Sequence, residues 1–183
     1  MDVESATDEL YGVSPPEFTA ARNAKAAEAR KAGLADVAAS LKKLRKPSAG
    51  AWLANLLVRE RPEEIGTLLD LGDSLREART TPGGDEIRRV SKQKVEVVST
   101  LIRHAKARAS RLGHPPSASV VEELEMTLDA AFADPQAATT LRQGRLTTGL
   151  RYSGLGFMAL PDTGSPSATW TPHATRPNKP MRT

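Results

Sequence analysis

Apolar residues recur at intervals of three and four along most of this chain, the spacing that gathers side chains on one face of an α-helix. The longest such row consists of Val95, Val98, Ile102, Ala105, Ala109 and Leu112. It predicts a long helix over 85–112 that packs against a neighbour through this seam. Shorter rows with the same spacing predict the other helices. The expected set is 15–32, 35–45, 48–60, 62–79, 85–112, 118–132 and 135–143.

Proline, glycine and capping residues mark the ends of these helices. Ser14 and Glu17 flank two prolines, and this order of hydroxyl, proline and acid is typical of a helix start. Gly33 is suited to end the same helix in the left-handed conformation. Pro62 has to interrupt the run before it, because it lacks an N–H group. We expect Asp85 to cap the long helix.

The chain divides into three parts by composition. Residues 1–13 are acidic and are interpreted as a flexible leader, with Leu10 and Tyr11 available to dock on the body. Residues 14–146 contain the helical pattern and predict an all-α fold, an antiparallel bundle of five to seven helices. Residues 147–183 are rich in Pro, Ser and Thr and have no sustained period. Such a segment buries too little apolar surface to offset its ordering entropy, so we expect a disordered C-terminal tail.

Composition narrows the class of protein. Hydrophobic residues make up 39% of the chain and aromatic residues only 4%, which argues against a large β-sheet. Cysteine is absent, so disulfides and cysteine-ligated metals are excluded. No apolar run approaches the roughly 20 residues that span a bilayer, and the N-terminus has no secretory apolar segment. We therefore expect a cytoplasmic protein with no membrane partner.

Charge is the most informative feature for function. The net charge is only +4, but its sign alternates from segment to segment, and two stretches are strongly basic. We call Lys42, Lys43, Arg45 and Lys46 the 42–46 cluster. The second stretch is the long helix, whose candidate residues are Arg88, Arg89, Lys92, Arg103 and Lys106. Such cations bind phosphate and release counterions. The alternatives are a solvated face, or pairing with the acidic helices 62–79 and 118–132.

Three other interpretations of these basic residues are open. Lys94 and Arg108 fall on or near the apolar side of the long helix, where their stems are expected to pack. Residues 23–46 have a weak likeness to a helix-turn-helix, whose second helix would present Lys42, Lys43 and Arg45. The 42–46 cluster also precedes a helix start, and a helix N-terminus with basic neighbours is a candidate anion site.

Signatures of catalysis are missing. The chain has no phosphate-binding loop and no dinucleotide fingerprint. His104, His114 and His173 are isolated in the sequence, without the spacing of a metal site, and His104 is expected to be exposed. Pairs such as Ser91 and Lys94 match the serine–lysine pattern of hydrolases but lack its companion motifs. We expect no catalytic residues, no metal and no cofactor.

Several stretches resemble a family of uncharacterised helical proteins from high-GC actinobacteria. They are 10–22 (LYGVSPPEFTAAR), 44–48 (LRKPS), 51–55 (AWLAN) and 144–146 (GRL). The resemblance covers about residues 9–157 and implies a helical fold and a cytoplasmic location, with no activity and no catalytic residues. From Met158 onward the sequence departs from the acidic, Ala-rich continuation expected of that family. We hypothesise a shifted reading frame there, which sequencing of the locus tests.

Together these features predict a non-enzymatic binding or scaffold protein. The first expectation is sequence-nonspecific contact with nucleic acid through the basic helix and the 42–46 cluster. The alternative is a protein–protein module that binds an acidic protein or a second copy of the chain. An enzyme is the third choice, and the oligomeric state is not determined by the sequence.

Overall fold

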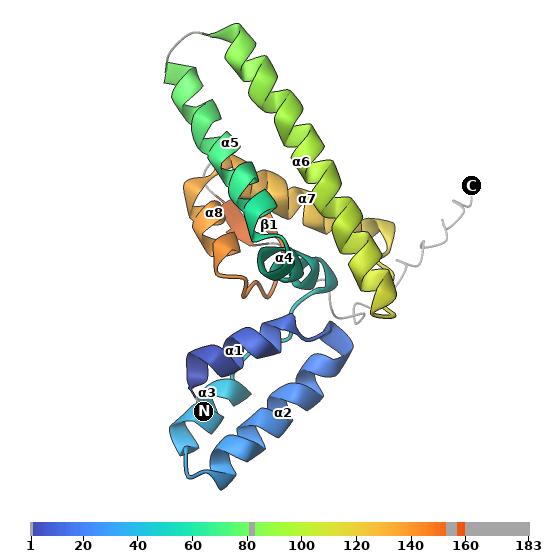
Figure 1. The fold of residues 1–183 in the computed structure, drawn as a ribbon. Coiled ribbons are helices and arrows are strands. Elements are labelled where there is room, and N and C mark those ends of the chain that lie inside the picture. Colours follow the sequence, from blue (N-terminus) through green and yellow to red (C-terminus); the bar gives the residue numbers. More distant parts are fainter. Residues whose placement is uncertain (1, 81–82, 153–156, 160–183) are drawn as a thin grey trace, which may run out of the picture.

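The computed structural model describes residues 2–80, 83–152 and 157–159. Its helices are α1 (Val3–Gly12), α2 (Pro15–Lys31), α3 (Ala35–Lys42), α4 (Ala49–Glu60), α5 (Pro62–Thr80), α6 (Gly84–Arg111), α7 (Ala118–Ala133) and α8 (Pro135–Arg142). Two short strands follow, β1 (Leu150–Tyr152) and β2 (Phe157–Ala159). The all-α class is confirmed. Figure 1 shows a smaller lobe of α1–α3, the N-lobe, and a larger one of α4–α8, the C-lobe, from which α5 and α6 project as a hairpin.

The N-lobe has a hydrophobic core of its own. Leu10, Phe18 and Leu41, one from each of its helices, are fully buried in it. The ring of Tyr11 packs on that of Phe18 with centroids 5.5 Å apart. Gly33 adopts a φ of 76° between α2 and α3, as predicted, and lets the chain reverse direction there.

Helix α1 corrects the expectation of a flexible leader over 1–13. Asp2 caps the helix by accepting a hydrogen bond from the backbone N–H of Ser5 at 3.0 Å. Leu10 and Tyr11 are 0% and 4% exposed, so these two residues dock as expected, but the segment that carries them is a helix. Burial of the apolar side of α1 offsets the conformational entropy that this segment loses when it becomes ordered.

The C-lobe is built around α4, which is buried on nearly all sides. Leu53 and Leu57 of α4 share the core with Leu101 of α6 and Leu128 of α7. This cluster and that of the N-lobe have no residue in common. Within the helical bundle expected over 14–146, the buried residues thus form two separate hydrophobic cores.

Helix α6 buries a row of residues that coincides only in part with the predicted seam. The fully buried row consists of Val90, Leu101, Ala105 and Ala109. Of the rest of the predicted seam, Val98 and Ile102 are only partly buried, while Val95 is 64% exposed and Leu112 is 41% exposed. The prediction is thus wrong for Val95 and Leu112. Helices α4 and α5 pack on the neighbouring row, which the sequence period alone does not distinguish.

Two of the predicted helix starts form in a different way. Ser14 stands at the N-cap of α2, but its hydroxyl donates to the Glu17 carboxylate at 2.6 Å, and the N–H of Glu17 bonds to the carbonyl of Ser14 at 3.0 Å. Gly83, not Asp85, is the N-cap of α6. Ser48 caps α4 as a side-chain acceptor for the N–H of Ala51 at 3.1 Å.

The ordered chain continues beyond residue 146. Leu146 and Leu150 are 5% and 2% exposed in the C-lobe core, and the N–H of Leu150 donates to the Thr127 hydroxyl at 3.0 Å. Strand β1 pairs antiparallel with β2, with Leu150 opposite Ala159. The expected disordered tail is therefore wrong for 147–152 and for β2. The remainder of that prediction, over 153–156 and 160–183, lies outside the described residues.

Candidate functional site

The five candidate cations of the basic helix lie on the outer side of α6, and we call them the α6 face. Arg88 and Arg89 each pair with an acid one turn earlier, Asp85 at 3.3 Å and Glu86 at 2.5 Å. The Arg88 and Asp85 side chains are 85% and 99% exposed. Exposed pairs of this kind add little stability, so both arginines can exchange their partners for an external anion.

Lys92, Arg103 and Lys106 are exposed and have no carboxylate partner among the described residues. Their spacing places them on one stripe that runs about 21 Å along the helix. Arg103 and Lys106 stand beside an open groove of about 540 Å³ between α6 and the first half of α7. The groove is lined by Ser99, Ile102, Arg103, Lys106, Ala107, Ser110 and Glu125.

Apolar surface adjoins these cations. Val95 is 64% exposed and Ile87 is 38% exposed, both on the half of α6 that projects with α5. Ile102 continues the row of Val95 at heptad spacing into the groove. Most of the seam that the sequence predicted as a helix–helix contact is covered, but Val95 is exposed and Ile102 is only partly buried, and basic side chains lie along one edge of these two residues.

The cations that point inward on α6 are paired. Lys94 bonds to Asp129 of α7 at 2.7 Å, and its ammonium lies 4.8 Å from the centroid of the Phe132 ring. Arg108 bonds to Glu60 at the end of α4 at 2.7 Å. Pairing with the acids of other helices therefore holds for these two residues, while Lys92, Arg103 and Lys106 of the α6 face have no carboxylate partner among the described residues.

His104 is not exposed as expected, because it lies in a polar cluster between α4 and α6. Arg61 donates to its Nδ1 at 3.1 Å, so Nε2 carries the proton and faces the Glu60 carboxylate at 3.0 Å. Burial alone would raise the pKa of Glu60, but hydrogen bonds from Arg108 and His104 outweigh it and hold that pKa below its ordinary value. The arrangement joins two helices, and none of its residues lines the groove beside Arg103 and Lys106.

The 42–46 cluster lies in the other lobe, so the structure does not join it to the α6 face (Figure 1). Lys42, Lys43, Arg45 and Lys46 are all exposed and have no carboxylate partner among the described residues. Helix α3 ends at Lys42, and the other three cations follow it in a non-helical segment. The proposed recognition helix of a helix-turn-helix is therefore too short to present them.

The anion site expected at the start of α4 is filled by the protein itself. One oxygen of Glu123 accepts from the Ser48 hydroxyl at 2.5 Å and from the N–H of Gly149 at 3.0 Å. A Cβ added at Gly50 would lie 2.5 Å from the other oxygen. The carboxylate thus occupies the positive end of the helix, where Arg45 and Lys46 were expected to help bind a phosphate.

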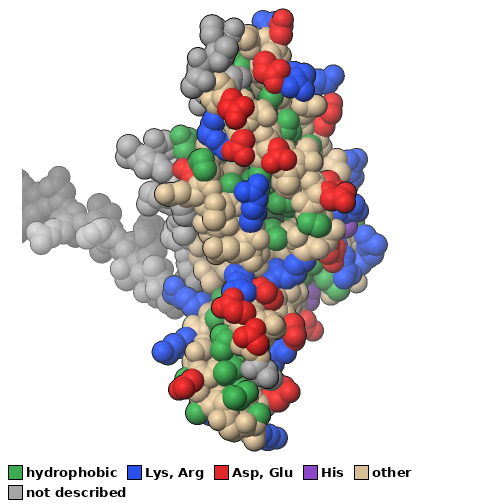
Figure 2. All heavy atoms as spheres, turned by 60° about the vertical axis from the view of Figure 1, so that its left-hand side comes forward, with side chains coloured by type: hydrophobic (Ala, Val, Ile, Leu, Met, Phe, Trp, Pro, Cys, Tyr) green, Lys and Arg blue, Asp and Glu red, His purple; other side chains and the backbone are tan. Residues whose placement is uncertain are grey.

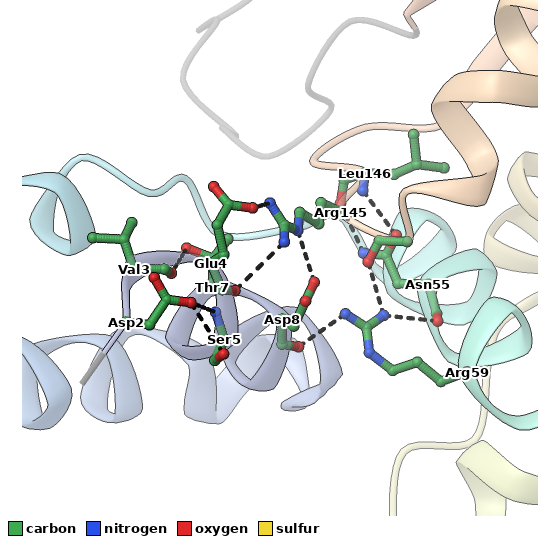
Figure 3. Close-up of polar contacts among 11 residues, drawn as sticks. Asp2, Val3, Glu4, Ser5, Thr7, Asp8, Asn55, Arg59, Arg145 and Leu146 are labelled. Atoms are coloured by element: carbon green, nitrogen blue, oxygen red, sulfur yellow. Dashed lines mark hydrogen bonds and ion pairs between the residues drawn. The ribbon is translucent and has the colours of Figure 1, made fainter.

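A polar network that the sequence did not indicate joins the lobes (Figure 3). Arg145 binds the carboxylate of Asp8 at 2.7 Å and that of Glu4 at 2.6 Å. Arg59 donates to the backbone oxygens of Asp8 at 2.9 Å and Gly144 at 2.8 Å. The hydrogen bond from Arg145 holds the pKa of Asp8 below its ordinary value, and burial lowers the pKa of Arg59.

Asn55 supports this network from inside the core. It is fully buried, and its side-chain amide donates to the carbonyl of Leu146 at 2.9 Å and accepts from the N–H of the same residue at 2.8 Å. This paired bond holds the segment that carries Arg145 against α4. The motif 144–146 was visible in the sequence only as part of a resemblance, and nothing in its spacing pointed to its distant partners.

The described residues contain no group of His, Asp and Glu that could hold a metal ion. No helix in the described part of the chain is long and apolar enough to cross a bilayer. Comparison with family models, with curated proteins and with solved structures finds no match to this chain.

Proposed function

We propose that this chain is a non-enzymatic binding protein that docks an acidic amphipathic helix of a partner protein on the outer side of α6. The observation that supports this proposal is that exposed apolar surface adjoins cations with no carboxylate partner in the described part of the chain. Val95 and Ile102 offer an apolar strip, and Lys92, Arg103 and Lys106 flank it. An amphipathic helix with acidic flanks matches both features.

A second copy of the chain fits this surface poorly. Two α6 helices packed antiparallel through Val95 and Ile102 would place Lys92 of one copy beside Lys106 of the other. A parallel pair would place each lysine beside its own equivalent. Both arrangements bring like charges together at the edge of the contact, which disfavours self-association.

Nucleic acid is the second candidate, and the 42–46 cluster is the observation that favours it. Four exposed cations within this short segment have no apolar component and suit phosphate contact. The α6 face suits it less well, because Val95 interrupts the cations. On the side of the molecule shown in Figure 2, acidic and basic side chains are interspersed, so no broad basic field attracts a polyanion there.

Fluorescence anisotropy with two labelled probes separates these candidates. One probe is a peptide helix with leucines on one face and glutamates on its flanks, and the other is random-sequence duplex DNA. The variant Val95→Ser should weaken peptide binding about fivefold, because it removes apolar contact area, and should leave DNA binding unchanged. Lys106→Glu should weaken peptide binding as well, since the glutamates lose a cation.

Arg142→Glu is the matched control, because Arg142 is an exposed cation at the end of α8. It should leave peptide affinity unchanged. If Val95→Ser and Lys106→Glu both bind the peptide with the affinity of the parent chain, the acidic-helix proposal is contradicted. Binding of DNA alone, with affinity that falls steeply between about 50 and 200 mM salt, favours the second candidate.

A further inference from the structure

The two lobes meet through polar contacts, and each has its own core. The hydrophobic cluster of α1–α3 and that of the C-lobe share no residue. Helix α1 is the N-lobe element that packs on α4. Interfaces that are small and polar permit relative movement of the parts they join, whereas large apolar interfaces prevent it.

The chain between the lobes is held at both ends and has a short link between them. On the N-lobe side, Arg22 donates to the carbonyl of Leu44 at 2.9 Å, and the Tyr11 hydroxyl donates to that of Arg45 at 3.1 Å. On the C-lobe side, the N–H of Ser48 donates to the carbonyl of Thr147 at 2.8 Å. The backbone of residues 46–47 is the part between these anchors.

Arginines of the C-lobe bind the acidic side of α1 (Figure 3). We call Arg59, Arg145, Glu4 and Asp8 the latch. Arg145 bridges two carboxylates one helical turn apart, and Arg59 reaches the backbone at the same turn. The Glu4 and Asp8 side chains are 71% and 53% exposed, so water and salt reach these ion pairs.

The latch is closely packed around Gly144. Its φ of 63° favours glycine, and a Cβ added there would lie 3.2 Å from both Val58 and the Arg59 guanidinium. A side chain at this position would therefore press on the group that reaches across to α1. The backbone that carries Arg145 passes close to α4 at this point, with Asn55 fixing the next residue.

We propose that the N-lobe is a hinged unit, that it turns about residues 46–47, and that the latch of Arg59 and Arg145 on Glu4 and Asp8 holds it closed. Raised ionic strength opens it, because salt screens the exposed ion pairs while the two apolar cores stay intact. Opening moves the 42–46 cluster relative to the α6 face, so the latch controls whether one ligand can contact both. This device does not depend on which ligand binds.

Energy transfer between two dyes on the full-length chain tests the proposal. The chain has no cysteine, so Ser40→Cys on α3 and Ser91→Cys on α6 place one label on each lobe at exposed positions. Between about 50 mM and 1 M salt, the transfer efficiency should change as the lobes separate, while the helical circular dichroism stays constant.

Arg145→Gln should raise the ratio of open to closed molecules about fivefold at low salt and remove most of the salt response. Arg88→Gln is the matched control, because it removes an exposed arginine whose ion pair lies within α6. This variant should have the same transfer efficiency, and the same response to salt, as the parent chain.

A transfer efficiency that is the same in the parent chain at both salt concentrations, and the same in Arg145→Gln, overturns the proposal. If Arg145→Gln loses helix, the salt titration of the parent chain decides alone. Constant efficiency then means that the lobes are one rigid body.

Discussion

At the scale of single residues, close contacts between backbones decide which side chains are tolerated. Helix α5 crosses the end of α7 at Gly72, where an added Cβ would lie 2.2 Å from the carbonyl oxygen of Phe132. The same oxygen accepts a hydrogen bond from Arg76 at 2.9 Å. Because the Phe132 oxygen belongs to the backbone, it cannot move aside by changing rotamer. Glycine is therefore required at position 72 because a Cβ has no room, and not because of its φ angle.

Gly72→Ala should therefore lower the free energy of unfolding by about 1–3 kcal/mol, since α5 and α7 have to move apart. Gly66→Ala is the matched control on the same helix, where an added Cβ meets nothing within 4 Å. That change should raise stability by up to about 1 kcal/mol, because alanine is the better helix former. Urea unfolding followed by circular dichroism measures both. A loss of equal size at the two positions would contradict the packing explanation.

At the scale of elements, a side chain of one helix can fix the position of another helix by hydrogen bonding to its end. Glu123 of α7 is the example, since its carboxylate accepts from Ser48 at the start of α4 and from the N–H of Gly149 before β1. On α6, the inward cations Lys94 and Arg108 pair with acids of α7 and α4, whereas the outward cations pair only within α6 or have no carboxylate partner among the described residues. The basic helix α6 thus has one side whose cations bind neighbouring helices and another side whose cations are exposed to solvent.

Glu123→Ala should lower the free energy of unfolding by about 1–3 kcal/mol, because it leaves a hydroxyl and an N–H without their acceptor. It also removes an acid from the positive end of α4. Glu122→Ala, an exposed change on the same turn of α7, serves as the control and should shift stability by less than about 0.5 kcal/mol. The measurement is chemical unfolding of both variants at neutral pH, and equal losses would rule out the bridging role of Glu123.

At the scale of the whole molecule, ion pairs from Arg145 to Glu4 and Asp8 join the two lobes, so pH acts on this contact. The pKa of Asp8 is lowered chiefly by its hydrogen bond from Arg145, and partial desolvation opposes this effect. A lowered pKa in the folded state means that ionised Asp8 stabilises the closed molecule above the ordinary carboxyl pKa of 3.8. This contribution disappears as the pH falls through the folded-state value.

The stability difference between the parent chain and Asp8→Asn should be about 0.5–1 kcal/mol at neutral pH, a size that allows for solvent screening of an exposed pair. It should shrink below about pH 4 as the parent's own carboxyl becomes protonated. Arg145 and Arg59 are the charged groups that face Asp8. Denaturant unfolding at several pH values measures the difference. Asp36→Asn, an exposed change on α3, is the control, and a difference that persists at low pH would contradict the role of ionised Asp8.

Helix positions were predictable because the rules that govern them are local. Proline and glycine restrict the backbone within one or two residues, and apolar spacing reports an amphipathic face within one helix. These rules suffice for α2 to α8 and for the end of α2 at Gly33. They failed for α1, because its apolar side is short and its partners, Phe18 and Leu41, lie in two later helices.

The sequence predicted which cations belong to the candidate site, but it did not predict how they are arranged in space. Sequence alone identified the α6 face and the 42–46 cluster, since charge and helical phase are local properties. The separation of the two groups into different lobes, the filling of the α4 start by Glu123 and the exposure of Val95 all depend on which helices pack together. The latch joins Arg145 to Glu4 and Asp8 across nearly the whole described chain. Contacts of that kind come from the packing of distant segments, and no local pattern encodes them.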